Sequence, residues 1–184
     1  MISAPQPEAV DAGADILNLG GNAIDAAIAC AFVQGVVDPL MCGIGGFGSM
    51  QLFMPKLKVH ECIDFHGKAP EKATPNMWAD RLEGEARDGF GFILKDHVND
   101  IGYQSITAPG SLKAYFEAHR DYGLLDWKTI LQPAIEYAEN GWVVRPHVDF
   151  WWSIKNHFGR TPNPDRVKFS KPGRDLYCDS QGNL

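Results

Sequence analysis

The sequence predicts an α+β fold that is mainly helical and contains one β-hairpin. Apolar residues recur at helical spacing in two alanine-rich segments near the N-terminus and again in three segments between residues 112 and 154. Between them, two short apolar runs, MQLFM and LKVHECIDF, flank a Pro-Lys turn over residues 49–65, as the two strands of a hairpin do. With 184 residues, 45% of them hydrophobic, the chain suits one domain or a large piece of one.

The first two predicted helices have clear start and stop residues. The first covers residues 7–19, with a proline in its first turn and Gly20-Gly21 at its end. Asn22 caps the second helix, which runs to about Gln34, and Asp25 occupies the third position, where a capping-box acid belongs. The many alanines of this second helix allow another element to approach it closely.

The middle and second half of the chain predict shorter helices. Pro75 begins one over residues 75–81, after which a glycine-rich and charged stretch is expected to be irregular up to residue 106. Two further helices cover residues 112–122 and 127–139, and they end at a glycine and at an Asn-Gly pair respectively.

The fifth predicted helix begins at Pro146 and carries three consecutive aromatic residues, Phe150-Trp151-Trp152. Such a cluster can stack on a ring or a sugar. With Val148 and Ile154 at helical spacing, however, it predicts part of a core or a subunit interface. From Gly159 onward, closely spaced prolines predict loop structure.

Composition and charge exclude several classes of function. A formal net charge of -6 and a pI near 5.4 argue against a nucleic-acid partner, which usually leaves a basic patch. The longest apolar stretch, residues 23–37, is interrupted by Asp25 and Gln34 and is too short to cross a membrane. The N-terminus has neither the basic nor the apolar region of a secretion signal, so a cytoplasmic protein with no membrane partner is expected.

The cysteines and histidines predict neither disulfides nor a metal site. The four cysteines show no C-x-x-C pairing and are expected to be free thiols. Cys42 has no base near it in the sequence, which predicts a buried and unreactive thiol. His60, Cys62 and His66 would face one side of a continuous strand, but no fourth ligand follows at a zinc spacing.

The stretch GIGGFG, residues 43–48, matches the dinucleotide-binding pattern G-x-G-x-x-G letter for letter. Asp64 lies 21 residues after Gly43, close to where a ribose-binding acid falls. That motif needs a strand before the glycines and a helix after them, because the helix N-terminus binds the pyrophosphate. Here a helix precedes and a strand follows, so the run is expected to be a tight helix-to-strand connector, with no cofactor and no helix dipole directed at it.

Several longer motifs resemble one known family. GGNAIDAA, VDPLMCGIGGFG, IDF followed by APEKATPNMW, TAPGSLKAYFEAHRDYG and LQPAIEYAENGWVV occur in the order and spacing of the γ-glutamyltransferase family. The resemblance covers most of residues 1–150 and fades over residues 151–184. Phe47 replaces a glycine of the family's usual run. Residues 1–184 therefore resemble the N-terminal portion of that family's large subunit.

The resemblance implies an N-terminal-nucleophile hydrolase with an αββα sandwich, of which this chain supplies a mainly helical part. Such enzymes cleave themselves into a large and a small subunit, and the new N-terminal threonine attacks an amide substrate through an acyl-enzyme. The four threonines here, at positions 74, 107, 129 and 161, do not lie in the family's processing motif. No catalytic residue is therefore expected in this chain, whose partners would be a small-molecule amide, the small subunit and, in an oligomer, further copies.

The resemblance also assigns a substrate-binding position. In the family, the motif D-x-R-E-x-A-P supplies an arginine that clamps the α-carboxylate of the γ-glutamyl donor, for which a bidentate guanidinium is well suited. This chain has DFHGKAP over residues 64–70, with His66 in place of the arginine and Gly67 in place of the glutamate. The imidazole has fewer donors and is largely neutral at pH 7, which predicts altered acyl specificity. Lys68 is the second candidate, as a flexible point charge.

Two other interpretations of these residues remain open at the level of sequence. His66 can equally be a partly exposed histidine at a strand end with no role in binding. The whole chain can also be a non-catalytic domain of the same fold that binds a ligand or a partner. A threonine-led motif followed by a Gly-Gly pair, encoded downstream of Leu184, would distinguish the enzyme from the binding domain.

Overall fold

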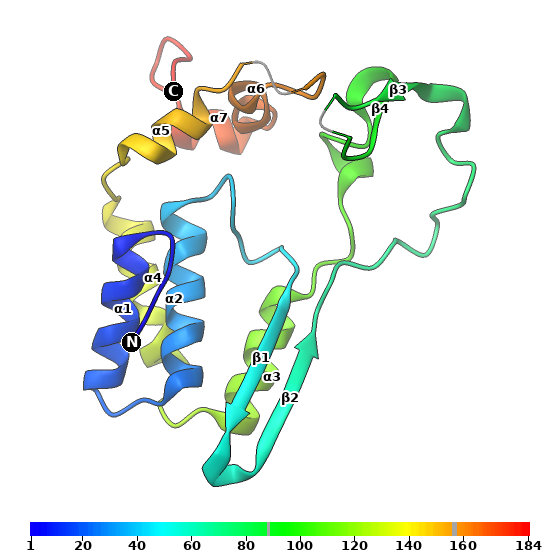
Figure 1. Cartoon of the computed structure of the whole chain (residues 1–184). Helices are drawn as coiled ribbons and strands as arrows, with labels where there is room; N and C mark the ends of the chain where they lie inside the picture. The colour runs from blue at the N-terminus through cyan, green and yellow to red at the C-terminus, as the bar shows by residue number, and fades with distance from the viewer. Residues whose placement is uncertain (88, 156–157) are drawn as a thin grey trace. The chain divides into compact units, whose positions relative to one another are not determined.

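Figure 1 shows the computed structural model of the chain, which describes residues 1–87, 89–155 and 158–184. The chain forms two compact units. Unit 1 contains residues 1–68 and 108–144, and unit 2 contains residues 69–107 and 145–184. Among the residues that the structure describes, every helix is too short or too polar to cross a bilayer.

Unit 1 contains four helices and one antiparallel hairpin, all of which the sequence predicts. In chain order they are α1 (Pro7–Asn18), α2 (Ala23–Val37), β1 (Ser49–Met54), β2 (Val59–Asp64), α3 (Ser111–Tyr122) and α4 (Trp127–Asn140). α1, α3 and α4 all pack against α2. α2 is therefore the central element of the unit, and its position decides where the loop that follows it lies.

The start of α2 confirms the predicted capping box. The Asn22 side chain accepts hydrogen bonds from the backbone N–H groups of Ile24 and Asp25, at 2.8 and 3.1 Å. The Asp25 carboxylate in turn accepts from the Asn22 backbone N–H at 2.9 Å. Three N–H groups that the first helical turn leaves unpaired are thus satisfied by two side chains.

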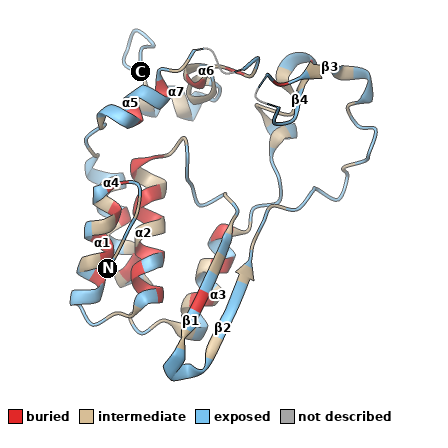
Figure 2. Ribbon diagram, viewed as in Figure 1, coloured by how far each residue is buried: buried red, intermediate tan, exposed pale blue. Residues whose placement is uncertain are grey.

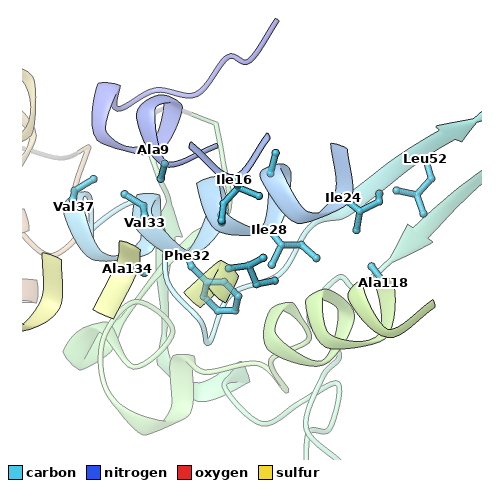
Figure 3. Close-up of a cluster of buried hydrophobic side chains, with 14 residues drawn as sticks. Ala9, Ile16, Ile24, Ile28, Phe32, Val33, Val37, Leu52, Ala118 and Ala134 are labelled. Atoms are coloured by element: carbon cyan, nitrogen blue, oxygen red, sulfur yellow. The ribbon is translucent and has the colours of Figure 1, made fainter. Parts of the chain in front are cut away.

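Other elements cover most of α2, and its residues are accordingly apolar on nearly all sides. Ile28, Phe32 and Val33 are among its buried residues, and they form one cluster with residues of α1, α3, α4 and β1 (Figure 3). Gly13 of α1 allows the close approach of the two helices, since a Cβ atom there would lie 2.4 Å from the Cys30 sulfur. The alanine-rich sequence of α2 therefore serves close packing, as predicted.

α2 continues three residues beyond the predicted end near Gln34, and a buried polar network explains why. The side chains of Gln6, Gln34 and Asp38 are all buried. Gln6 donates to Asp38 Oδ2 from its Nε2 at 3.0 Å, and its backbone N–H donates to Gln34 Oε1 at 3.2 Å. Tertiary burial outweighs the low helix propensity of the glycine and two valines that end the helix. The network fixes the exact point at which the chain leaves α2.

The hairpin carries one apolar face. Its strands pair in register from Ser49 opposite Asp64 to Met54 opposite Val59. Leu52 is buried against the core cluster, whereas most of the hairpin is exposed, as Figure 2 shows. The alternation follows from the two-residue period of a strand. One consequence is that the end of β2, at Asp64, is accessible to solvent.

Unit 2 has more regular structure than the sequence predicts. In chain order it contains a 3-10 turn (Ala79–Arg81), β3 (Leu82–Glu85), β4 (Phe92–Leu94), two further 3-10 turns (Lys95–His97 and Tyr103–Ser105), α5 (Pro146–Trp152), α6 (Asn163–Lys168) and α7 (Lys171–Tyr177). Only α5 coincides with a predicted helix. The predicted irregular stretch includes residue 88, which lies outside the described residues.

The predicted helix over residues 75–81 is wrong. The chain there makes successive turns with i to i+3 hydrogen bonds, from Met77 N–H to the Thr74 carbonyl at 3.2 Å and from Ala79 N–H to the Asn76 carbonyl at 3.1 Å. Trp78 donates from its indole to the Gln104 side chain at 3.1 Å. Residues 75–81 have too few apolar side chains at helical spacing to stabilise an α-helix against these i to i+3 turns.

The predicted loop after Gly159 is also wrong, because two short helices form there. Both have a proline in the first turn, at Pro164 and Pro172, where the missing N–H costs nothing. The Ser170 hydroxyl caps α7 by accepting from Gly173 N–H at 3.1 Å. These two prolines therefore mark helix starts and not a loop.

The aromatic cluster of α5 divides between core and surface. Trp152 is buried and packs edge-to-face on Tyr177 of α7, with ring centroids 5.1 Å apart. Val148 is also buried. Phe150 instead remains exposed at 62%. The core alternative is thus confirmed for Trp152 and wrong for Phe150, for which the subunit interface stays a prediction.

A partly buried ion pair joins the two chain segments of unit 2, residues 69–107 and 145–184. Asp100 accepts a hydrogen bond from the Thr161 backbone N–H at 2.7 Å and pairs with the Arg166 guanidinium. Arg166 also donates from Nε to the Thr161 carbonyl at 3.1 Å. Burial opposes ionisation of Asp100, but the bonds from Thr161 and the charge of Arg166 outweigh it and lower the pKa of the carboxyl.

Replacing Asp100 with asparagine is expected to lower the free energy of unfolding by about 1–3 kcal/mol at neutral pH, the cost of a lost hydrogen bond to a charged group. Since the pKa is lower in the folded protein, the carboxylate's contribution is complete above the unfolded-chain pKa of about 3.9 and disappears as the pH falls through the folded value. Denaturant unfolding at neutral and acid pH measures both effects.

Asp96 provides the matched control for this experiment. Its pairing with Arg81, at 3.5 Å, is exposed to solvent, and asparagine at position 96 should change stability by less than about 0.5 kcal/mol. Equal losses for the two asparagine variants, or an acid sensitivity unchanged in the Asp100 variant, would contradict the role given to the buried pair.

Candidate substrate-binding site

The glycine run lies in the connection from α2 to β1, as predicted, and it is tied to the start of α3. The Gly46 carbonyl accepts hydrogen bonds from the backbone N–H groups of Gly110 and Ser111, at 3.1 and 3.2 Å. The expectation that no helix N-terminus points at this run is therefore wrong. The helix comes from later in the chain, and two of its first N–H groups already bond to the loop's own carbonyl.

His66 lies two residues beyond the end of β2, where the Asp64 carboxylate orients it. Asp64 Oδ1 is 2.8 Å from His66 Nδ1 and also accepts from the His66 backbone N–H at 3.0 Å. These bonds from His66, with a smaller contribution from the charge of Lys68, hold the pKa of Asp64 below its ordinary value. Because Asp64 accepts from Nδ1, the neutral imidazole has its free lone pair at Nε2.

The second ring at this place belongs to Phe47. The ring centroids of Phe47 and His66 are 5.6 Å apart, with an angle of 39° between the planes. Both residues are exposed. The glycine run and the segment after β2, which are separate in the sequence, thus form one surface with an imidazole and a phenyl ring side by side.

Lys68 is anchored by its backbone and not by its side chain. Its carbonyl accepts from the Ala108 N–H at 2.9 Å in an isolated antiparallel bridge. The residue is exposed. Its ammonium group contributes to the field at Asp64, as a mobile point charge does. Of the two predicted binding residues, only His66 has a side chain fixed by a hydrogen bond that the structure describes.

Two side chains behind the glycine run were not predicted as part of this site. Ser111 is buried at the start of α3, and its hydroxyl bonds to Tyr115. Burial raises the pKa of the Tyr115 phenol, and the Ser111 hydrogen bond opposes that effect. Tyr115 also packs edge-to-face on Phe65, the residue before His66, with centroids 5.7 Å apart. The motif TAPGSLKAYF carries both residues, but their helical spacing alone indicates only a core face.

Cys42 is exposed, so the prediction that it is buried is wrong. It lies in the turn after α2, where Asp38 accepts its backbone N–H at 3.0 Å, and not on a helix face. Partial burial of the sulfur, together with the negative charge of Asp38, raises the pKa of the thiol above its ordinary value. A raised pKa favours the thiol over the more nucleophilic thiolate at neutral pH. All four cysteines are free.

The histidine and cysteine pattern on β2 does not hold three ligands together. β2 ends at Asp64, so His66 lies outside the strand whose alternation would have aligned it with His60 and Cys62. The His60 ring packs on Phe53, with centroids 5.6 Å apart. Within residues 1–87, 89–155 and 158–184, no three histidine, cysteine or acidic side chains are grouped as a metal site would require.

An open apolar groove of about 660 Å³ adjoins the other end of the glycine run. Its lining consists of Ile44, Gly45, Pro109, Leu112, Lys113, Phe116 and Trp127. Lys113 is the one charged residue in this set. The glycine run therefore has apolar side chains near both of its ends.

The chain matches the family described as gamma-glutamyltranspeptidase over residues 9–180. It is 40% identical over 151 residues to an acylase ACY 1 proenzyme of Pseudomonas sp. (strain V22), covering 80% of this chain and 26% of that protein. It is 37% identical over 144 residues to a glutathione hydrolase proenzyme of Bacillus subtilis (strain 168), covering 78% of this chain and 23% of that protein. The chain thus spans about a quarter of the length of these curated relatives.

Solved structures agree with this match. A gamma-glutamyltranspeptidase of Helicobacter pylori superposes with a TM-score of 0.79 at 26% identity, covering 98% of this chain and 47% of that chain. A cephalosporin acylase from Bacillus halodurans superposes with a TM-score of 0.69 at 33% identity, covering 89% of this chain and 27% of that chain. The α+β fold class of the N-terminal-nucleophile hydrolases, predicted from the sequence, is confirmed.

Proposed function

Because the chain belongs to the gamma-glutamyltranspeptidase family, we propose that it is the N-terminal portion of the large subunit of a self-processing amidohydrolase or acyltransferase. The family match over residues 9–180 carries this proposal. The names of two relatives, an acylase proenzyme and a glutathione hydrolase proenzyme, support a precursor that is processed and an activity on amides. The partner would be a small subunit from the same precursor.

The proposed reaction is acyl transfer from an amide. A threonine hydroxyl outside this chain attacks the amide carbonyl while its own α-amine accepts the hydroxyl proton. The carbon–nitrogen bond breaks, the amine leaves with that proton, and the acyl group remains as a threonine ester. Water or a second amine then takes the acyl group and releases the threonine. Donors to the developing oxyanion would contribute about 3–4 kcal/mol, also from outside this chain.

His66 is the residue proposed to select the acyl group. Asp64 Oδ1 lies 2.8 Å from its Nδ1 and can only accept, so the neutral form of the ring carries its hydrogen on Nδ1 and presents an acceptor at Nε2. The nearby Asp64 carboxylate is itself negative, because its pKa is low. A substrate carboxylate at this place would meet repulsion from Asp64 without the compensation of a guanidinium. Acyl groups without an α-carboxylate therefore fit this site better.

Lys68 is proposed only as an auxiliary residue. Its exposed ammonium group is close enough to influence Asp64 and would partly offset the negative field near His66. A flexible lysine gives no bidentate geometry, so it does not replace an arginine clamp. Alanine at position 68 should accordingly reduce any residual γ-glutamyl activity more than activity on neutral acyl amides.

The test compares wild type and His66→Arg in the complete, self-cleaved enzyme. A γ-glutamyl anilide and a set of neutral acyl anilides serve as donors, and kcat/KM is measured for each. Wild type should prefer neutral donors. His66→Arg should raise kcat/KM for the γ-glutamyl donor about 10–100-fold relative to the neutral ones, as expected for restoring a charge-assisted hydrogen bond of about 1.5–3 kcal/mol.

His60→Arg is the matched control, because it places the same charge at another exposed histidine, on strand β2. The ring of His60 packs on Phe53. This variant should leave the donor preference unchanged. A wild-type preference for the γ-glutamyl donor that His66→Ala does not alter would exclude His66 from acyl selection. Absence of turnover in an intact, processed protein would instead favour a binding domain of the same fold.

A further inference from the structure

Two of the residues at which this chain departs from its family's pattern, Phe47 and His66, lie in contact with each other. Phe47 takes the place of a glycine in the glycine run, and His66 takes the place of the arginine after β2. These positions are 19 residues apart in the sequence (66 minus 47), yet their ring centroids are 5.6 Å apart. Each replacement alone is a local change, but together they exchange a cationic, open place for two adjacent rings.

The His66 ring and the backbone around Phe47 are held in position, although both residues are exposed to solvent. On one side of Phe47 the Gly46 carbonyl accepts from Gly110 and Ser111, and on the other side the Gly48 carbonyl accepts from Phe65 N–H at 3.0 Å. His66 is held by its two hydrogen bonds to Asp64. The backbone on either side of Phe47 is therefore fixed, so little ordering is required of the residue when a ligand binds.

Packing within the chain does not account for Phe47. The residue is 63% exposed and is not part of the core cluster of unit 1. An exposed phenyl ring gains little free energy in folding, and most of its apolar surface is still available for burial. An exposed ring on a hydrogen-bonded stretch of backbone is suited to receive a second apolar or aromatic group.

We propose that Phe47 is a specificity-determining residue, and that with His66 it forms an aromatic wall that binds acyl groups ending in an aromatic ring. The proposal rests on the proposed acyl-transfer function and names the substrate class of the same site. The phenyl ring contacts the acyl group's ring. The imidazole completes the surface, and its Nε2 accepts a hydrogen bond from any donor that the acyl group carries next to its ring.

The chain contains its own control for this idea. Phe53 and His60 form a second exposed pair on the same hairpin, with ring centroids 5.6 Å apart at an angle of 78°. Phe53 is 70% exposed, close to the value for Phe47. This pair lies one register position from the turn of the hairpin, at the opposite end from Asp64. It matches the first pair in chemistry and exposure and differs from it in location.

The experiment compares wild type, Phe47→Ala, Phe47→Trp and Phe53→Ala in the complete, self-cleaved enzyme. The donors are phenylacetyl and acetyl p-nitroanilide, and the ratio of their kcat/KM values is the readout. Phe47→Ala should lower the phenylacetyl-to-acetyl ratio about tenfold, as expected for a lost aromatic pair and its buried area. Phe47→Trp should keep the ratio, and Phe53→Ala should leave it unchanged.

A binding measurement separates this inference from the proposed catalysis. The Kd of phenylacetate, the product acid, should rise about tenfold in Phe47→Ala, while acetate binding should change little. If phenylacetate binds in this Phe47-dependent way but no amide is cleaved, the aromatic wall is supported and the proposed reaction fails. If amides are cleaved but Phe47→Ala lowers kcat/KM equally for both donors, the proposed reaction is supported and the aromatic wall is overturned.

Discussion

Replacing Asp25 with alanine is expected to lower the free energy of unfolding by about 3–5 kcal/mol, because the change removes a buried carboxylate that several groups depend on. The Asp25 side chain is completely buried. It accepts a hydrogen bond from the Asn22 backbone N–H at 2.9 Å. The Leu124 backbone N–H donates to both of its oxygens, at 3.2 Å to Oδ1 and 3.1 Å to Oδ2. His119 Nε2 lies 3.7 Å from Oδ1.

The size of the effect follows from what the substitution leaves behind. Leu124 lies in the turn between α3 and α4, so Asp25 joins the start of the central helix to the connection between two helices that pack on it. Alanine would leave the partly buried N–H groups of Asn22 and Leu124 without this acceptor. A hydrogen bond to a charged acceptor contributes about 1.5–3 kcal/mol, and at least two are lost.

Denaturant unfolding of matched variants tests this expectation. Asp15→Ala is the control, since Asp15 is an exposed aspartate on the neighbouring helix α1 and its loss should cost less than about 0.5 kcal/mol. Asp25→Asn keeps the shape of the side chain but turns one acceptor into a donor, so it should also be strongly destabilised. A loss below about 1 kcal/mol for Asp25→Ala would contradict the role assigned to the buried carboxylate.

Asp25 also illustrates how far sequence reasoning extends in this fold. Its local bond to Asn22 is predictable, because a capping box is a pattern of fixed spacing. Its bond to Leu124 spans 99 residues, and no spacing rule reaches that far. The length of α2 beyond Gln34 has the same origin, since the network that supports it includes Gln6, 28 residues away from Gln34.

The errors in unit 2 have a different physical cause. β3 and β4 have four and three residues, too few for an alternating pattern to be distinguished from an irregular charged stretch. The two helices after Gly159 each have a proline in the first turn, and prolines are compatible both with loops and with first turns. In α7 the serine before the proline, Ser170, is the additional signal that distinguishes a helix start from a loop, because its hydroxyl caps the helix.

The candidate site was predictable only through the family resemblance. That resemblance singles out His66, and the sequence alone shows that Asp64 is nearby. The contact of His66 with Phe47 and the attachment of Gly46 to the start of α3 are tertiary facts. The replacements at positions 47 and 66 are separate in the sequence, and only the tertiary structure, which brings the glycine run next to the end of β2, shows that the two side chains touch.

Replacing Phe32 with alanine is expected to lower the free energy of unfolding by about 3–5 kcal/mol, the usual cost of removing a buried phenylalanine. Phe32 is 5% exposed, and its ring packs edge-to-face on Tyr115 and on Trp127, with centroids 5.6 and 5.5 Å apart. The cavity would open at the point where α2 meets both α3 and α4. Such edge-to-face pairs add about 0.5–1.5 kcal/mol each to the burial of area.

Removing Phe32 should also destabilise the candidate site locally, because ring contacts connect Phe32 through Tyr115 to Phe65, the residue before His66. Tyr115 packs on Phe65, whose N–H donates to the Gly48 carbonyl at 3.0 Å. With Phe32 removed, Tyr115 loses its support on the core side, and the Phe65–Gly48 hydrogen bond should open more often. Hydrogen exchange at the Phe65 amide should therefore accelerate in Phe32→Ala by more than the global loss of stability explains.

Phe116→Ala separates burial from aromatic contact. Phe116 packs on Trp127 with the same 5.5 Å separation and 85° angle as Phe32, but it is 49% exposed and has no contact with Tyr115 among the described ring pairs. Its removal should cost about 1 kcal/mol or less and leave exchange at Phe65 unchanged. If both variants lose equal stability, Trp127 alone explains the effect and burial of Phe32 does not. If exchange at Phe65 follows global stability in Phe32→Ala, the core and the site are not coupled through Tyr115.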